Sequence, residues 1–316
     1  MSDARVLVTG GAGFIGSHVA ERFAREGYRV RVLDDLSSGT VDNCDADWEL
    51  LRASVCDPAA VEEATRQADV VVHLAAFTSV PESFERFRDC YHTNVFGTLN
   101  LLEACRSNAV RKLVFASSSA VYAELPDAPK GEDDCPEPIS PYAVSKLEGE
   151  HLLDAYQRIH ALESVALRFF NVYGPRQAAD SNYAAAVPIF TERGLRGQPL
   201  MIYGDGRQTR DFVFVADVAD AVFRASRPGP LGVFNVGSGE GLSVRELADT
   251  IAALTALAAD HRFEPPRPGD VRSSTADVRR VTKSVGWSPS HSFAKGLEQT
   301  IAWYRKQGRP TPGSPR

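Results

Sequence analysis

Short apolar runs alternate with segments of helical periodicity through the first half of the chain. Runs bounded by turn residues predict buried parallel strands near residues 5–9, 28–33, 48–51, 69–74, 112–116 and 164–170. Segments with apolar residues three and four positions apart predict helices over 17–25, 57–67, 89–108 and 142–160. This βαβα order predicts an α/β fold with a doubly wound parallel sheet and right-handed crossovers.

The pattern loosens after Asn171 into short segments punctuated by proline and glycine. We therefore predict a second, smaller and discontinuous α/β domain that holds a substrate. The predicted division assigns residues 1–172 and about 209–238 to a nucleotide-binding domain, and about 173–208 and 239–305 to the substrate domain. Residues 306–316 are a proline-rich tail that we expect to be disordered.

Composition narrows the class of protein. With 316 residues, 43% of them hydrophobic and 24% charged, the chain is typical of a globular protein. Its net charge of −6 disfavours a nucleic-acid or membrane-surface binder. No apolar run approaches the roughly 18 residues of a membrane span, and a glycine motif begins too close to Met1 for a signal peptide. We expect a cytoplasmic protein with no nucleic-acid or membrane partner.

The cysteines are scattered and odd in number. They are Cys44, Cys56, Cys90, Cys105 and Cys135. No Cys-x-x-Cys pair occurs among them, which favours reduced thiols over a disulfide framework or a zinc site. The seven histidines form no spaced cluster either. We expect no metal ion.

The N-terminal glycine motif predicts a dinucleotide site. The strand at 5–9 leads directly into Gly10-Gly-Ala-Gly-Phe-Ile-Gly16 and then into a helix. A Rossmann sheet uses this order to place a pyrophosphate at a helix N-terminus. The next predicted strand ends at Asp34, where a carboxylate binds the adenosine ribose hydroxyls. Because that carboxylate repels a 2′-phosphate, we expect NAD rather than NADP.

Tyr142 and Lys146 predict the reaction centre. They stand four residues apart, so the phenol and the ammonium lie on one helix face. A free tyrosine titrates near ~10, and a phenolate base at neutral pH needs a pKa lower by roughly 2–3 units. Lys146 and a nicotinium ring, both positive, can supply that shift. A lone Tyr-x-x-x-Lys is usually a solvated helix face; with the glycine motif and the serines Ser117-Ser118-Ser119 upstream it indicates an oxidoreductase.

These motifs together resemble the extended short-chain dehydrogenases/reductases of the nucleotide-sugar epimerase/dehydratase family, and most of all its UDP-hexose 4-epimerase branch. The resemblance runs from Arg5 to about Trp303. Its further motifs are His73-Leu-Ala-Ala76, Ser117-Ser-Ser-Ala-Val-Tyr122, Arg168-Phe-Phe-Asn-Val-Tyr-Gly-Pro-Arg176, Gly204-Asp-Gly-Arg-Gln-Thr-Arg-Asp211, Asn235-Val-Gly-Ser-Gly239 and Arg267-Pro-Gly-Asp270.

The resemblance implies NAD as the cofactor and a UDP-sugar as the substrate. The implied cofactor contacts are Gly10, Gly13, Phe14, Ile15, Gly16, Asp34, Ser54, Val55, Leu74, Ala75, Ala76, Tyr142 and Lys146. The implied substrate contacts are Thr78, Ser118, Asn171, Arg210, Arg267, Asp270 and Ser274. Arginine suits a diphosphate because its planar fork meets phosphate oxygens bidentately.

The resemblance also implies catalytic roles for Ser118, Tyr142 and Lys146. The Tyr142 phenolate would remove the proton of the sugar 4-hydroxyl while NAD⁺ takes the C4 hydride. Ser118 would hydrogen-bond the same oxygen, and Lys146 would hold the nicotinamide ribose. The 4-keto sugar would then turn over in the site and receive the hydride on its opposite face, which regenerates NAD.

Three positions depart from the family's pattern. Ser54 stands where most members have an aspartate that contacts adenine, so Ser54 or the backbone must substitute for it. Ala123-Glu124 follows Tyr122 where a glycine usually supports the loop beside the sugar. Ser274 stands where 4-epimerases restricted to unmodified hexoses carry tyrosine. A small residue there predicts that UDP-GlcNAc and UDP-GalNAc are accepted as well as UDP-Glc and UDP-Gal.

The nearest alternative is a nucleotide-sugar dehydratase or decarboxylase that uses the same C4 oxidation. The 4,6-dehydratases place an Asp-Glu pair where this chain has Ser119-Ala120. A 5,6-dehydratase of UDP-GlcNAc is harder to separate, because Ser274 suits its substrate and Glu124 or a cysteine can supply the acid. A non-catalytic NAD-binding module is disfavoured because Tyr142 and Lys146 are both kept.

The resemblance finally implies a homodimer that forms through a four-helix bundle. Each copy would contribute the helix after Asp89 and the helix that carries Tyr142. The leucines that offer apolar surface for this contact are Leu99, Leu102, Leu147, Leu152 and Leu153. Packing into the core explains the same leucines equally well.

Overall fold

The computed structural model describes residues 4–122, 129–179, 185–255, 261–266 and 271–307. Its main feature is a seven-stranded parallel sheet with the strand order β10-β6-β5-β4-β1-β2-β3. The strands are β1 (Arg5–Thr9), β2 (Arg29–Asp34), β3 (Glu49–Arg52), β4 (Val70–His73), β5 (Lys112–Ser118), β6 (Glu163–Phe169) and β10 (Gly232–Val236). The predicted α/β class and doubly wound parallel sheet are confirmed.

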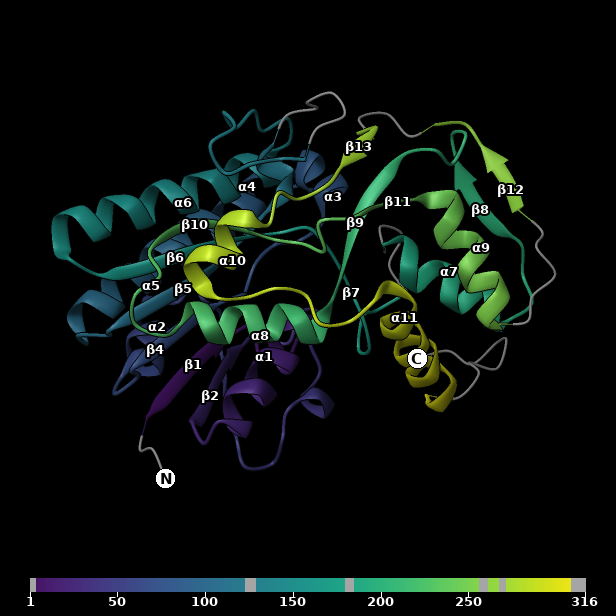
Figure 1. The fold of residues 1–316 in the computed structure, drawn as a ribbon. Coiled ribbons are helices and arrows are strands. Elements are labelled where there is room, and N and C mark those ends of the chain that lie inside the picture. The colour runs from purple at the N-terminus through teal and green to yellow at the C-terminus, as the bar shows by residue number, and fades with distance from the viewer. Residues whose placement is uncertain (1–3, 123–128, 180–184, 256–260, 267–270, 308–316) are drawn as a thin grey trace.

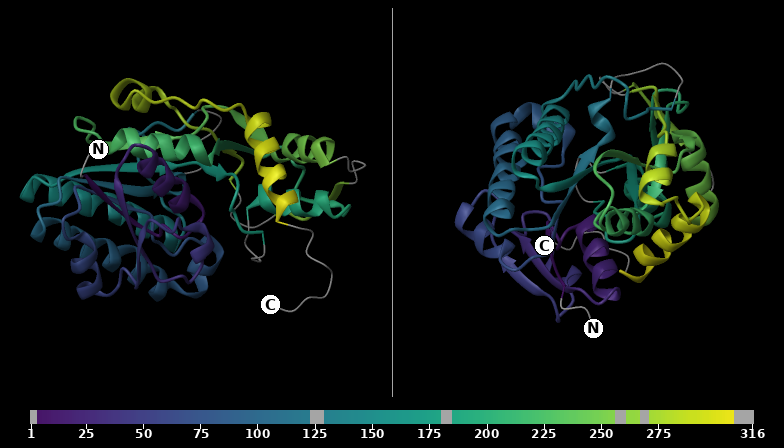
Figure 2. Two further views of the ribbon diagram at one scale, coloured as in Figure 1. Left: turned by 90° about the horizontal axis from the view of Figure 1, so that it is seen from below. Right: turned by 60° about the vertical axis from the view of Figure 1, so that its left-hand side comes forward.

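Helices cover both faces of this sheet, which makes three layers (Figure 1 and Figure 2, left). One face carries α1 (Phe14–Arg25), α8 (Val215–Ala225) and α10 (Arg279–Val285); the other carries α2 (Pro58–Thr65), α5 (Gly97–Ser107) and α6 (Pro141–His160). Val6 and Val8 of β1 pack toward α1 and α8, whereas Leu7 packs toward α2 and α5. Since alternate side chains point to opposite faces, a strand covered on both sides reads as a continuous apolar run.

The predicted helix over 89–108 consists of three pieces. They are α4 (Phe87–Tyr91), a π-helical turn (His92–Phe96) and α5, and the short helix α3 (Val80–Glu85) precedes them. Asn94 lies in the π-helical turn, and its side chain exchanges two hydrogen bonds with the backbone of Phe77. The turn has no sequence signal of its own, so the apolar residues on either side of it predict one continuous helix.

A second unit follows β6 and has a core of its own. Its four-stranded sheet contains β11 (Gly241–Ser243), β9 (Thr209–Phe214), β13 (Ser273–Ser274) and β7 (Asn171–Tyr173), and β12 (His261–Glu264) pairs with β8 (Leu200–Tyr203). Its helices are α7 (Ala186–Leu195), α9 (Val244–Thr255) and α11 (Phe293–Lys306). The predicted domain division stays a prediction; β9 lies in this second sheet, and α10 packs against β10 of the first.

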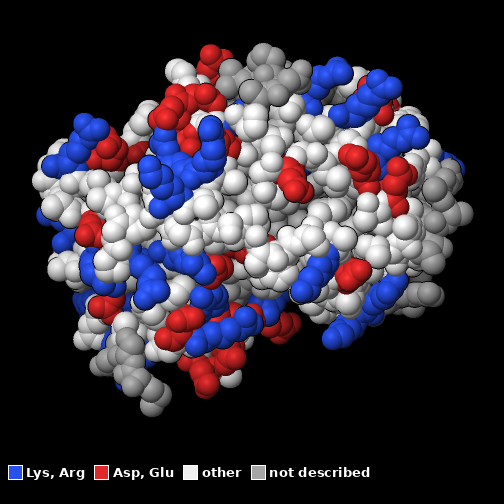
Figure 3. Space-filling view, in the orientation of Figure 1, with Lys and Arg blue, Asp and Glu red and all other residues white. Residues whose placement is uncertain are grey.

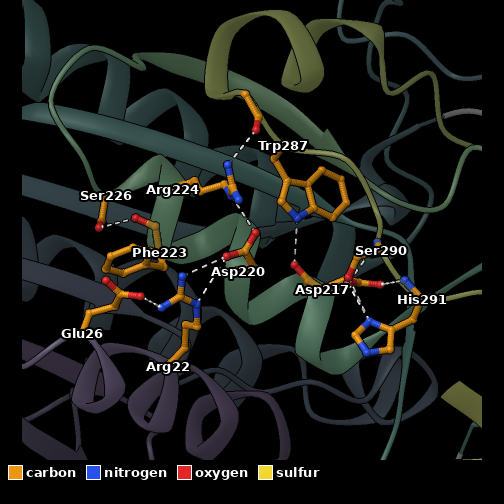
Figure 4. A network of polar contacts seen from close by, with 11 residues as sticks. Arg22, Glu26, Asp217, Asp220, Phe223, Arg224, Ser226, Trp287, Ser290 and His291 are labelled. Carbon is orange, nitrogen blue, oxygen red and sulfur yellow. Dashed lines mark hydrogen bonds and ion pairs between the residues drawn. The ribbon is translucent and has the colours of Figure 1, made fainter.

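Polar contacts fasten the segment before α11 to α8 (Figure 4). The buried Asp217 carboxylate of α8 accepts hydrogen bonds from Ser290 Oγ (2.6 Å) and His291 Nδ1 (2.9 Å). Trp287 Nε1 donates to the Asp217 carbonyl (3.0 Å). These contacts join the C-terminal segment to the first layer of helices and so set where α11 begins.

Two observations describe the helices and one face of the surface. None of the described helices is both long and apolar enough to cross a membrane. On the face drawn in Figure 3, basic and acidic side chains are interspersed rather than gathered into one basic stripe. Of the predicted tail, residues 308–316 lie outside the described part of the chain.

Candidate active site

The glycine motif forms a tight turn between β1 and α1. Gly10 has φ of +69°, and a Cβ on it would lie 2.7 Å from the backbone N of Ala75. A Cβ on Gly16 would lie 2.0 Å from the Gly10 carbonyl oxygen. The helix can therefore approach the loop this closely only because residue 16 is glycine. Gly13 caps α1 without a side-chain hydrogen bond, which leaves first-turn N–H groups for a ligand.

Substituting alanine for Gly13 is expected to lower the affinity for NAD by about 100-fold, because the second glycine lets the backbone approach the pyrophosphate. The added Cβ would stand 3.2 Å from the Gly10 carbonyl oxygen, a contact that a small shift relieves, so the fold should persist. Calorimetric titration with NAD measures the loss. Gly131→Ala is the matched control, since among the described residues its Cβ would meet only Asp134 Oδ2, at 3.8 Å; equal affinities of the two variants would contradict the assignment.

A cavity of about 1630 Å³ opens beside this loop at the carboxyl ends of the strands. Most of the predicted cofactor and substrate residues line it. They are Gly10, Gly13, Phe14, Ile15, Gly16, Asp34, Val55, Leu74, Ala75, Ala76, Thr78, Ser118, Tyr142, Lys146 and Asn171. Residues far apart in the sequence are thus brought to one wall, as expected at the switch point of a doubly wound sheet.

Asp34 lies at the end of β2 and faces the cavity. Its carboxylate accepts hydrogen bonds from the backbone N of Ala12 and of Leu36, both at 2.9 Å. Burial raises the pKa of Asp34, and these two hydrogen bonds act against that rise. A carboxylate has about four acceptor positions, so Asp34 keeps capacity for the two hydroxyls of a ribose.

Ser54 does not line the cavity. Its hydroxyl accepts a hydrogen bond from the backbone N of Cys56 (3.2 Å), and Ala53 and Val55 form the wall on either side of it. Any adenine at this wall therefore meets apolar side chains and backbone. Of the two substitutes expected for the aspartate, Ser54 or the backbone, this placement favours the backbone.

The three predicted catalytic residues meet at the end of β5. Ser118 Oγ accepts a hydrogen bond from the backbone N of Ala120 (3.1 Å) and is hydrogen-bonded to Tyr142. Lys146 Nζ lies 5.8 Å from the centre of the Tyr142 ring and donates to the Ala116 carbonyl (2.8 Å). The helix that carries both residues begins where Ser140 accepts a hydrogen bond from the backbone N of Ala143.

The pKa of Tyr142 is not lowered in the protein alone. Burial raises it to about 12, and the hydrogen bond with Ser118 acts in the opposite direction. Burial lowers the pKa of Lys146 to about 8, so this ammonium is itself only weakly favoured. The buried thiol of Cys90 also lies close enough to affect both groups. The expected shift combines Lys146 with the positive nicotinium ring, so the raised pKa of Tyr142 in the protein alone leaves that joint effect a prediction.

Asn94 is a site residue that the motifs do not reveal. Its Nδ2 donates to Ser145 Oγ (2.9 Å), and Ser145 Oγ donates to the Tyr142 carbonyl (2.7 Å). Its Oδ1 accepts from the backbone N of Phe77 (2.7 Å), one residue past Ala76 in the cavity wall. Asn94 thereby holds the first turn of α6 and this loop in one arrangement. In the sequence Asn94 follows two other polar residues, His92 and Thr93, so nothing there sets it apart.

Arg176 and Gln177 also line the cavity without a predicted role. Arg176 pairs through Nη2 with Glu21 of α1, whereas its Nη1 is buried and has no partner among the described residues. Gln177 Oε1 is likewise buried without such a partner. An orphan donor, the glycine turn, the open N-terminus of α1 and Asp34 together fit an anionic dinucleotide such as NAD.

The substrate residues fall into two groups. Thr78 and Asn171 line the cavity with the catalytic residues. Arg210 and Ser274 do not; they face each other as partners of β9 and β13 in the second sheet. Arg267 and Asp270 lie outside the described residues, as does Ala123-Glu124.

Comparison with known proteins gives a consistent set of relatives. Residues 6–237 match the family model described as "NAD dependent epimerase/dehydratase family". A UDP-glucose 4-epimerase of Mycolicibacterium smegmatis is 40% identical over 313 residues, 96% of this chain and 100% of that protein. The structure of Thermotoga maritima UDP-glucose 4-epimerase with UDP-glucose has a TM-score of 0.93 and 39% identity, covering 96% of this chain and 99% of that one. A UDP-N-acetylglucosamine 4-epimerase from Methanobrevibacter ruminantium, in complex with UDP-N-acetylmuramic acid, has a TM-score of 0.93 and 36% identity, covering 97% and 100%.

Proposed function

Since the chain belongs to the NAD-dependent epimerase/dehydratase family, we propose that it inverts C4 of a UDP-hexose through a transient 4-keto sugar, with UDP-GlcNAc and UDP-GalNAc among its substrates. The chain is an enzyme, and NAD is its cofactor. The observation that carries the proposal is the meeting of Ser118, Tyr142 and Lys146 on the cavity wall next to the glycine turn.

Each of these side chains has a role that its position supports. Tyr142, as the phenolate, takes the proton of the 4-hydroxyl, and Ser118 hydrogen-bonds the same oxygen. Lys146 adds positive charge near Tyr142 and can reach the nicotinamide ribose from the next turn of α6. When bound beside the glycine turn and Asp34, NAD would supply the hydride acceptor and donor for C4. Proton and hydride are both given back, so no external redox partner is consumed.

From the resemblance to the family, we assign the diphosphate of the substrate to Asn171, Arg210 and Arg267, and the uridine ribose to Asp270. Asn171 begins β7 and Arg210 lies on β9, the strand with which β7 pairs. The register joins Asn171 to Phe212, so Arg210 lies two residues from the partner of Asn171. Alternate residues of a strand share a face, which allows both side chains to meet one ligand.

An elimination is less well supported than an epimerisation. Dehydration of the 4-keto sugar needs an acid and a base near C5 and C6. Among the described residues, the acidic side chains that line the cavity are Asp34, Asp35, Asp42 and Glu192. The first three lie in and after β2, at the cofactor end, and Glu192 lies in α7. Ser119 and Ala120 form a short turn and offer no carboxylate beside Tyr142.

The proposal is tested by incubating the purified protein with UDP-GlcNAc and with UDP-Glc, without added NAD, while following the sugar protons by NMR. New anomeric signals of the galacto configuration from both substrates are expected. Olefinic or deoxy-sugar signals would identify a dehydratase instead, and loss of the carboxylate carbon of a UDP-uronic acid would identify a decarboxylase.

We propose a cytoplasmic location for the enzyme. All five cysteines lie in the described part of the chain, and each is a free thiol. Free thiols persist in a reducing compartment, whereas secreted proteins usually pair them.

We also propose a homodimer that forms through a four-helix bundle, to which each copy contributes the segment after Asp89 (α4, the π-helical turn and α5) and α6; these elements contact one another on one side of the first sheet, and α3 lies beside them. Phe84, Phe87 and Phe96 are 62%, 47% and 51% exposed on these turns, and such aromatic side chains mark association surfaces. Two of the leucines considered for this contact, Leu102 and Leu153, are buried in the core and are not available to a partner.

Replacing Phe87 with glutamate is expected to convert the dimer to monomer at micromolar concentration, because a charge buried at an apolar interface is strongly unfavourable. Sedimentation velocity measures the change. Leu231→Glu is the control, since Leu231 is 44% exposed next to β10, away from α3 and α4. A wild-type protein that sediments as a monomer would reject the dimer.

A further inference from the structure

A buried ion pair lies behind the strand end that carries Ser118. Glu150 of α6 and Arg168 of β6 share two hydrogen bonds, from Nε to Oε1 (2.9 Å) and from Nη2 to Oε2 (2.7 Å). Both side chains are only 4% exposed, and neither is among the residues that line the cavity. A buried pair gains little net stability, because both charges lose their hydration. Net stability therefore does not explain why this pair lies next to the strand end, whereas its contacts with Ser117 and Tyr122 do.

The pair fixes the residue before Ser118. Ser117 Oγ donates to Glu150 Oε1 (2.5 Å), and Ser117 is the register partner of Arg168 across β5 and β6. Glu150 lies one turn after Lys146, which donates to the Ala116 carbonyl. Side chains of α6 thus hydrogen-bond two consecutive residues of β5, Ala116 and Ser117, just before Ser118.

The close approach of α6 to β5 makes these hydrogen bonds possible. A Cβ on Gly149 would lie 2.4 Å from the Phe115 ring, so the helix comes this near only because residue 149 is glycine. The carboxylate of Glu150 and the ammonium of Lys146 then reach the strand itself rather than solvent.

The same pair supports the chain after Ser118. The guanidinium carbon of Arg168 lies 4.8 Å from the centre of the Tyr122 ring. Tyr122 donates to Asn235 Oδ1 (2.7 Å), and Asn235 Nδ2 donates to the Lys130 carbonyl (2.8 Å). Both flanks of the short turn that begins at Ser118 are therefore held in one buried network.

We propose that Glu150 and Arg168 are positioning residues that hold Ser117 and Tyr122, so that the Ser118 hydroxyl stays at hydrogen-bond distance from Tyr142. The inference rests on the proposed function, in which both hydroxyls must reach one substrate oxygen. Ser118 Oγ already accepts from the backbone N of Ala120. Its direction is thus set by the turn, and the turn is set by its two anchored ends.

Two mild variants test the inference while leaving the ion pair intact. Ser117→Ala and Tyr122→Phe each remove one hydroxyl from the network. We expect each variant to lower kcat by about tenfold, because a small misplacement near the reacting atoms lowers the rate. The value of kcat is measured from formation of the reduced nicotinamide or of the epimer. KM and the amount of bound NAD should stay unchanged. The controls are Ser226→Ala and Tyr173→Phe, which remove buried hydroxyls bound to the carbonyls of Phe223 (2.7 Å) and Phe293 (3.0 Å). Their kcat should stay at the wild-type value.

A double-mutant cycle separates positioning from general destabilisation. In a Ser118→Ala background, Ser117→Ala should cost no further rate, because the group that it positions is gone. Additive losses, or a lower melting temperature with unchanged kcat, would overturn the inference.

A titration without substrate distinguishes this inference from the proposed function. The absorbance of the Tyr142 phenolate is taken as the difference between the NAD-loaded protein and its Tyr142→Phe variant. Ser117→Ala should raise the pKa of Tyr142, because the hydrogen bond from Ser118 lowers it. An unchanged pKa overturns the positioning role whichever sugar the enzyme converts, and an inactive wild-type protein with the expected shift overturns only the proposed function.

Discussion

Replacing Tyr142 with phenylalanine is expected to lower turnover of the UDP-sugar by about 10²–10⁴-fold, the contribution of a positioned acid–base group, while NAD stays bound. The ring remains in place, so the cavity wall keeps its shape. Only the hydroxyl that exchanges a proton with the substrate is lost. Turnover is measured by NMR of the sugar protons, and bound NAD by its absorbance after the protein is denatured.

Tyr156→Phe provides the control for this change. Tyr156 lies on the same helix and hydrogen-bonds Glu103 of α5, away from the cavity. Its loss should leave turnover within about twofold, the range of ordinary surface changes. Turnover by Tyr142→Phe at the wild-type rate would show that another base acts, and absence of turnover in both proteins would show that the protein only binds NAD.

Electrostatics explain why this tyrosine depends on its cofactor. Burial raises the pKa of Tyr142 to about 12 in the protein alone, so at pH 7 the phenol is neutral. A nearby positive charge favours the phenolate. Lys146 supplies part of this positive charge, but only below the pKa of its ammonium, which is about 8. In the protein alone Lys146 would lose its proton near pH 8, well before Tyr142 ionises near pH 12. In a pH–rate profile of the NAD-loaded enzyme, the rise in rate as Tyr142 ionises should therefore lie well below pH 12, because the cofactor's positive charge lowers the pKa of Tyr142.

The sequence predicts the first sheet well because its signals are local. In β1 and α1 the apolar run, the glycines and the helical period stand within residues 5–25, and the structure has them in that order. The elements after Asn171 are different. The strands β11 and β13 have three and two residues, too short to show a period, and they exist only because β9 lies between them.

Local sequence signals likewise predict some residues of the candidate site and not others. Motifs place Ser118, Tyr142 and Lys146, because spacing along one strand end and one helix face decides where they point. Asn94 lies in a π-helical turn and hydrogen-bonds Ser145 of another helix. The spacing of apolar residues predicts neither the turn nor this contact. Arg176 becomes informative only when the structure shows one of its nitrogens buried without a partner among the described residues.

Replacing Ser274 with tyrosine is expected to lower turnover of UDP-GlcNAc by about 100-fold, at the scale on which a pocket rejects an added group, and to leave UDP-Glc within a few-fold. Ser274 is half-buried on β13 and is the register partner of Arg210, which we assign to the diphosphate. In the proposed binding mode, a phenol extending from this position would occupy the space beside the sugar that an N-acetyl group at C2 needs, whereas an unmodified hexose has only a small hydroxyl at C2.

Paired kcat/KM values for the two sugars measure this change in substrate preference, with Ser274→Ala as the matched control. Alanine keeps the position small, so both substrates should turn over as in the wild-type protein. Since the change acts by steric exclusion, its effect should appear for the acetamido sugar alone and leave bound NAD unchanged. Equal losses for both sugars in Ser274→Tyr would mean that β13 has been displaced from β9 and that Ser274 does not control substrate choice.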